Sequence, residues 1–73
     1  MVDSPTVFIY QIRIDGRLRE SWSGYFAGLE LSHDKDHNTI LTGPVADQTA
    51  LRGILCQIWD LNLEVISVNR LRE

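Results

Sequence analysis

The sequence predicts an α+β fold of the ferredoxin-like kind, βαββαβ, in which a four-stranded antiparallel sheet carries two helices on one face. Residues 7–14 alternate from side to side as a strand does, and residues 47–62 repeat apolar side chains at helical spacing. Two further alternating segments enclose the polar turn 34–38, which indicates a hairpin. With right-handed crossovers, this element order predicts a sheet with the strand order 4-1-3-2.

The first strand and the first helix are expected within residues 7–28. The turn Asp15-Gly16 ends the strand, and the segment 17–28 is predicted to be a short helix because aromatic residues recur at helical spacing. Gly24 and Gly28 weaken this helix, since glycine lowers helix stability. The side chains expected to face the core are Phe8, Tyr10, Ile12 and Ile14 from the strand, and Leu18, Trp22, Tyr25 and Phe26 from the helix.

The other strands are three alternating segments bounded by turn residues: 29–33, 39–43 and 63–68. Pro44 is expected to end the third strand, because proline has no amide to donate to a sheet. In this interpretation the chain is one domain, 1–73, with flexible tails at 1–6 and 70–73.

The segment 47–62 is predicted to be the main helix. Asp47 suits its N-cap, because a carboxylate accepts from the free amides of the first turn, and Asn62 tolerates the left-handed conformation that ends a helix. Cys56 and Gly53 fall on the outward side. The core-facing side carries Leu51, Ile54, Leu55, Ile58 and Leu61, of which Leu51, Leu55 and Ile58 are expected to be almost fully buried.

Composition narrows the function classes. The net charge of −3 argues against a nucleic-acid surface, which needs clustered basic residues. Cys56 is the single cysteine, so no internal disulfide can form, which fits a reducing compartment. The N-terminal residues lack the pattern of a signal peptide, and no apolar run is long enough to span a membrane. We therefore expect a cytoplasmic protein that binds neither nucleic acid nor membrane.

Three groups of residues resemble chemical sites. The segment 33–37 holds His33 and His37 with two carboxylates, yet an ordinary polar hairpin loop is the favoured interpretation. Cys56 is favoured as a bystander thiol, since no histidine is near it in sequence. Aromatic residues in 22–26 are favoured as core rather than as a stacking platform. The sequence thus predicts no catalytic, cofactor-binding or metal-binding residue.

The chain resembles a group of small, uncharacterised bacterial proteins. The resemblance rests on Trp22-Ser23, Gly28-Leu29, Asp60-Leu61 and the longer run L-T-G-P-V-A-D-Q-x-A-L, which begins at Leu41, together with S-V-x-R, which begins at Ser67. It covers most of residues 8 to 70. The resemblance implies a compact bacterial domain and no known activity.

The predicted function is that of an interaction module, which forms a homodimer through the open face of the sheet and binds a protein partner. By alternation, this face is expected to carry apolar residues with a polar rim. Two alternatives remain: a small-ligand sensor similar to ACT modules, which share the βαββαβ order, and a small dimeric α+β-barrel enzyme. The predicted interface consists of Val7, Ile9, Gln11, Arg13, Ile40 and Val65.

Overall fold

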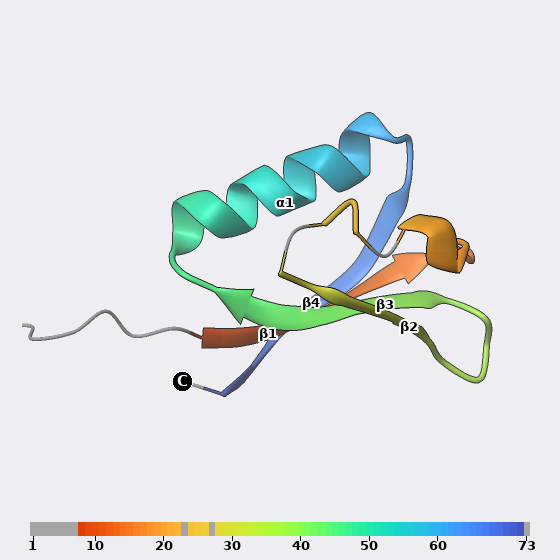
Figure 1. The fold of residues 1–73 in the computed structure, drawn as a ribbon, viewed down its shortest axis with the longest axis horizontal. Helices are drawn as coiled ribbons and strands as arrows, with labels where there is room; N and C mark the ends of the chain where they lie inside the picture. The colour runs from red at the N-terminus through yellow and green to blue at the C-terminus, as the bar shows by residue number, and fades with distance from the viewer. Residues whose placement is uncertain (1–7, 23, 27, 73) are drawn as a thin grey trace, which may run out of the picture.

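The computed structural model describes residues 8–22, 24–26 and 28–72, which form a four-stranded antiparallel sheet with one α-helix on it (Figure 1). The strand order is β2-β3-β1-β4, so the predicted order 4-1-3-2 is confirmed. The elements are β1 (Phe8–Asp15), the 3-10 turn η1 (Glu20–Trp22), β2 (Glu30–His33), β3 (Thr39–Val45), α1 (Gln48–Asp60) and β4 (Glu64–Arg72).

The predicted two-helix, ferredoxin-like fold is wrong, because the segment between β1 and β2 is not an α-helix. The described residues of this segment form turns, with η1 among them, so the described chain has one α-helix and is mostly β. The amide of Trp22 donates to Arg19 O and that of Tyr25 to Trp22 O, a three-residue spacing typical of turns rather than of an α-helix. Gly28, with φ of +81°, takes a conformation that ends helices.

The helix α1 forms where the sequence predicts it. The Asp47 carboxylate accepts a 2.8 Å hydrogen bond from the Ala50 amide, and Asn62 has a left-handed φ of 65° just beyond the last turn. Leu51 and Ile58 are buried, as expected. Leu55 is only half-buried, which corrects the expectation that it lies fully in the core.

Two strands are longer than predicted. β3 continues through Pro44 to Val45. Pro44 can lie within the strand because β2 reaches only as far as Glu30, opposite Thr42. Beyond that point β3 has a neighbour on one side only, and a residue without an amide is tolerated there. β4 continues to Arg72, so residues 70–72 form strand rather than a frayed tail. The predicted N-terminal tail, 1–6, lies outside the described residues.

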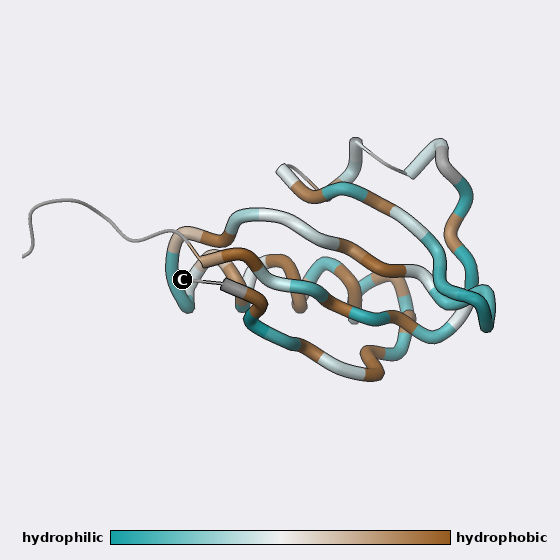
Figure 2. The backbone as a smooth tube through the Cα atoms, turned by 90° about the horizontal axis from the view of Figure 1, so that it is seen from below, coloured by the Kyte–Doolittle hydropathy of each residue, from teal (hydrophilic) through white to brown (hydrophobic). Residues whose placement is uncertain are grey.

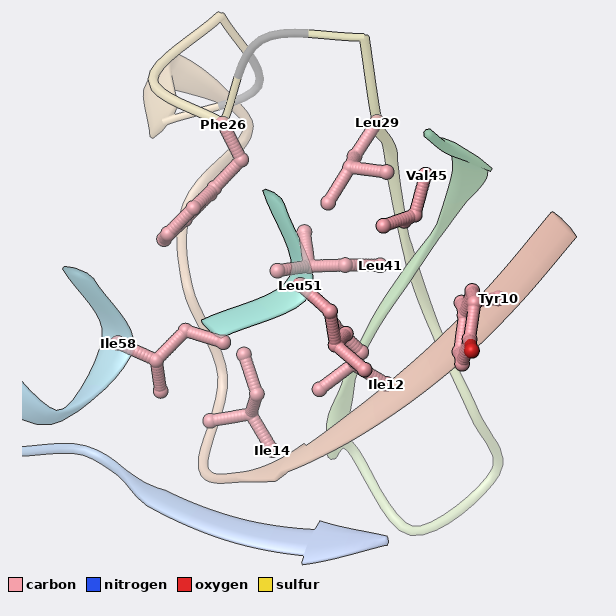
Figure 3. Close-up of a cluster of buried hydrophobic side chains, with 9 residues drawn as sticks. All are labelled: Tyr10, Ile12, Ile14, Phe26, Leu29, Leu41, Val45, Leu51 and Ile58. Atoms are coloured by element: carbon pink, nitrogen blue, oxygen red, sulfur yellow. The ribbon is translucent and has the colours of Figure 1, made fainter. Parts of the chain in front are cut away.

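The core lies between the sheet and two different covers, α1 and the crossover segment 16–29 (Figure 1). Trp22, which was expected to face the core, is only half-buried, whereas Phe26 is enclosed. Thr39 is the one buried polar residue of the described chain; its hydroxyl donates to Gly16 O and accepts from the Leu18 amide. The apolar core, shown in Figure 3, consists of Tyr10, Ile12, Ile14, Phe26, Leu29, Leu41, Val45, Leu51 and Ile58.

Candidate interaction surfaces

The sheet face opposite α1 is covered by no described element and is mostly polar. Figure 2 views the sheet from this side. In the register of the strands, Gln11 lies between Thr42 and Asn69, and Arg13 lies between Ile40 and Ser67. We call this surface the open sheet face. Polar side chains therefore occupy most of its central rows.

The predicted interface residues are divided by the structure. Ile9, Gln11, Arg13 and Ile40 lie on the open sheet face and are half-buried. Val65 does not: it is opposite Ile14 and packs against the core. Val7 lies outside the described residues. Ile9 and Ile40 are separated by the Gln11–Thr42 pair, so the described residues do not form the continuous apolar patch that alternation predicts.

A β-bulge explains the position of Val65. The pairing with β1 shifts between Ile14, which faces Val65, and Arg13, which faces Ser67, so Ile66 has no partner of its own. This extra residue reverses the alternation, and Val65 and Val68 both lie opposite buried residues of β1. The sequence carries no turn residue at this point that could have indicated the bulge.

Large exposed apolar side chains gather on and beside β4. Trp59, Ile66 and Leu71 are each half exposed or more, and Val68 is 36% exposed. We call these four residues the β4 edge surface. β4 forms one border of the sheet, seen opposite β2 in Figure 2. A shallow hollow lined by Trp59, Asn62, Leu63 and Glu64 lies where α1 passes into β4. None of the four residues of the β4 edge surface is among the interface residues predicted from the sequence.

The two histidines of the hairpin region have different surroundings. His33 Nε2 lies 2.7 Å from Leu18 O, and since a carbonyl only accepts, this ring nitrogen must carry the proton and donate. His33 thereby ties the crossover segment to β2. His37 is exposed in the turn, with a left-handed φ of 67°. Among the described residues, no three side chains of the metal-ligating kinds come together.

Asp34 organises the hairpin loop. Its Oδ1 accepts from the amides of Asp36 (2.8 Å) and Asn38 (2.9 Å), and its Oδ2, occluded from solvent, lies 3.1 Å from Nη1 of Arg13. The hydrogen bond from Asn38 lowers the pKa of this carboxyl below its ordinary value of 3.8; burial opposes the shift, while Asp36 and the Arg13 charge add to it. This contact ties Arg13, on the open sheet face, to the hairpin loop.

Replacing Asp34 with Asn is expected to make the protein less stable at neutral pH. Because the folded state lowers this pKa, the stabilisation is present above 3.8 and disappears as the pH falls through the folded-state value. The difference between wild type and Asp34→Asn should therefore shrink in acid, measured by urea unfolding at neutral pH and well below 3.8. Asp36→Asn, an exposed change in the same loop, is the control. A difference that stays constant with pH would show that the charge has no role.

The remaining candidates do not form a site within the described residues. Cys56 is an exposed free thiol on α1. The aromatic group is split between core and surface: Phe26 is buried, whereas Tyr25 is 45% exposed and contacts Trp22 and Phe26 edge to face. Phe26 confirms the expectation of core packing, and Tyr25 departs from it because the segment is a turn and not a helix.

Comparison with other proteins identifies the family to which this chain belongs. In the part of the chain that the structure describes, no helix has the length and apolar character needed to cross a membrane. Neither the curated proteins nor the solved structures include a match to this chain. The model of the family described as Domain of unknown function (DUF8691) matches residues 9–69, from β1 into β4, and the chain therefore belongs to that family.

Proposed function

We propose that this protein is a small interaction module that acts as a homodimer and binds protein through apolar surface. The observation that carries the proposal is the concentration of exposed apolar side chains on the β4 edge surface. Single exposed apolar residues are common on monomers, but several large ones on one border of a sheet are typical of a contact surface. The open sheet face, with its polar central rows, is the weaker candidate for that contact.

Sedimentation equilibrium from low to high micromolar concentration tests the proposal. We expect a dimer for the wild type and weakened association for Ile66→Ser, because Ile66 is half exposed and contributes apolar area to the contact. Ile9→Glu is the matched variant on the open sheet face, where it leaves the covered core untouched. Ile9→Glu should remain dimeric. A wild type that stays monomeric at high micromolar concentration would overturn the proposal.

A further inference from the structure

The hollow at the end of α1 has a fixed shape. It forms where α1 passes into β4, and it is lined by Trp59, Asn62, Leu63 and Glu64. The amide of Asn62 donates to Trp59 O at 2.8 Å and that of Leu63 to Ile58 O at 3.2 Å, so the last turn of the helix holds the backbone of this turn. Asn62 takes the left-handed φ of 65° that lets the chain reverse there. The backbone of the hollow is therefore in place before anything binds, which lowers the cost of binding.

Two chemically different side chains line the hollow. Trp59 is 54% exposed, and an indole is the ring that attracts cations most strongly. Glu64 is exposed at the first position of β4 and supplies a carboxylate. Leu63, which is half-buried, adds apolar surface between them. An aromatic ring, a carboxylate and an apolar side chain in one hollow favour a ligand that has a cationic head and an apolar stem.

This end of the molecule carries negative charge. Glu64 is directly opposite Asp15 of β1, and like charges in facing positions repel each other. α1 ends at Asp60 with no basic residue in its last turn, so the negative end of the helix dipole adds to the same field. The one salt bridge found in the described part of the chain joins Arg13 to Asp34 and includes none of these three carboxylates. A cation bound in the hollow would reduce the repulsion.

We propose that this hollow binds the guanidinium group of an arginine side chain from a protein partner; this rests on the protein-binding part of the proposed function. A guanidinium is flat, so it stacks on a tryptophan ring while its parallel N–H groups donate to a carboxylate. The methylene stem of arginine packs on apolar surface such as that of Leu63. A shallow hollow lined by a single ring suits a flat group, whereas quaternary ammonium groups are bound in cages of several aromatic rings.

The occupant is a basic partner and not a second copy of this chain. Each copy has a net charge of −3, so two copies repel each other at long range, whereas a basic partner is attracted. Of the four residues of the β4 edge surface, the hollow includes Trp59 alone. The other three, Ile66, Val68 and Leu71, are left for the contact of the proposed homodimer.

An NMR titration with short peptides tests the assignment. The probe is a blocked pentapeptide, glycine-serine-arginine-serine-glycine, added to isotope-labelled protein, and the matched probes carry citrulline or lysine in place of arginine. Citrulline has the shape of arginine without its charge, and lysine has the charge without the flat fork. We expect the amide signals of residues 59–64 to move most with the arginine peptide. That peptide should bind about threefold more tightly, or better, than either matched probe.

Variants locate the charge that selects arginine. Glu64→Gln keeps the shape of the side chain and should weaken binding of the arginine peptide by about threefold or more. Glu30→Gln is the matched control, because it removes the same charge from an exposed position on β2, at the opposite border of the sheet, and should leave the affinity nearly unchanged. Trp59→Leu keeps an apolar residue but should also weaken binding. In thermal melts Glu64→Gln should be no less stable than the wild type, because it removes the repulsion from Asp15.

The outcomes separate this site from the proposed function. Equal affinities for the arginine and citrulline peptides, or equal effects of Glu64→Gln and Glu30→Gln, would overturn the assignment. If the arginine peptide does not bind and Glu64→Gln weakens the homodimer in sedimentation, a second copy occupies the hollow and the assignment is wrong. A dimeric wild type with no preference for arginine overturns the site and leaves the interaction module standing. A monomeric wild type that prefers arginine supports the site and overturns the homodimer.

Discussion

Replacing Ile58 with Ala is expected to lower the free energy of unfolding by about 2–5 kcal/mol, as is typical when a buried isoleucine is truncated. Ile58 has no exposed surface and points from α1 toward the sheet, where Figure 3 shows it close to Ile14. Domains are stable by only roughly 0.05–0.15 kcal/mol per residue, so in this chain the loss is a large part of the total. Urea unfolding followed by circular dichroism measures it.

Leu55→Ala is the matched control for Ile58→Ala. Leu55 lies on the same helix, one turn earlier on the core-facing side, but is only half-buried. Its truncation removes less buried area and leaves a site open to water, so the loss should be about 1–2 kcal/mol. Equal losses for the two variants would mean that α1 is rotated on the sheet relative to the structure.

Gly43→Ala is expected to be nearly as damaging, for a different reason. A Cβ added to Gly43 would clash with Gly28 O and would lie 2.8 Å from Cδ2 of Leu29. The carbonyl belongs to the backbone of the crossover segment and cannot rotate away, so the segment must move off β3. Forced overpacking of this kind costs about 1–3 kcal/mol and occasionally more. A lower melting temperature measures the loss of stability. The movement of the segment should also increase the exposed fraction of the Phe26 side chain.

Gly53→Ala is expected to stabilise the protein, in contrast to Gly43→Ala. A Cβ at Gly53 would meet nothing within 4 Å, and this residue lies on the exposed side of α1. Alanine is favoured over glycine in a helix interior, so stability should increase by about 0.5–1 kcal/mol. If Gly43→Ala were as harmless as Gly53→Ala, the close approach of the crossover segment to β3 would be refuted.

Much of the sheet could be predicted from the sequence because its signals are local. The alternation of β1, the polar turn between β2 and β3, and the capped helix α1 each need only neighbouring residues to be recognised. The strand order followed from these elements and from the rule for crossovers. Asp47 and Asn62 show this most clearly, since each occupies the conformation that its side chain favours.

The errors arose where tertiary contacts override local pattern. Trp22, Tyr25 and Phe26 recur at helical spacing, but the segment follows the contacts of Phe26 and the glycine conformation at Gly28 instead. The bulge at Ile66 is a property of the pairing of two strands, so β4 alone could not reveal it. Val65 was placed on the wrong face for this reason, and the candidate surface moved from the open sheet face to the border of the sheet.

The crossover segment has a consequence for the order in which the chain folds. Besides the hydrogen bonds of its own turns, it is attached to the sheet through Leu18, whose amide donates to Thr39 and whose carbonyl accepts from His33, 21 and 15 residues further along the chain. A segment that depends on such distant partners cannot form before they are in place, since closing the loop costs entropy that only the finished contact returns. We therefore expect the β2–β3 hairpin to form before the crossover segment is ordered, whereas the cap and backbone hydrogen bonds of α1 are local.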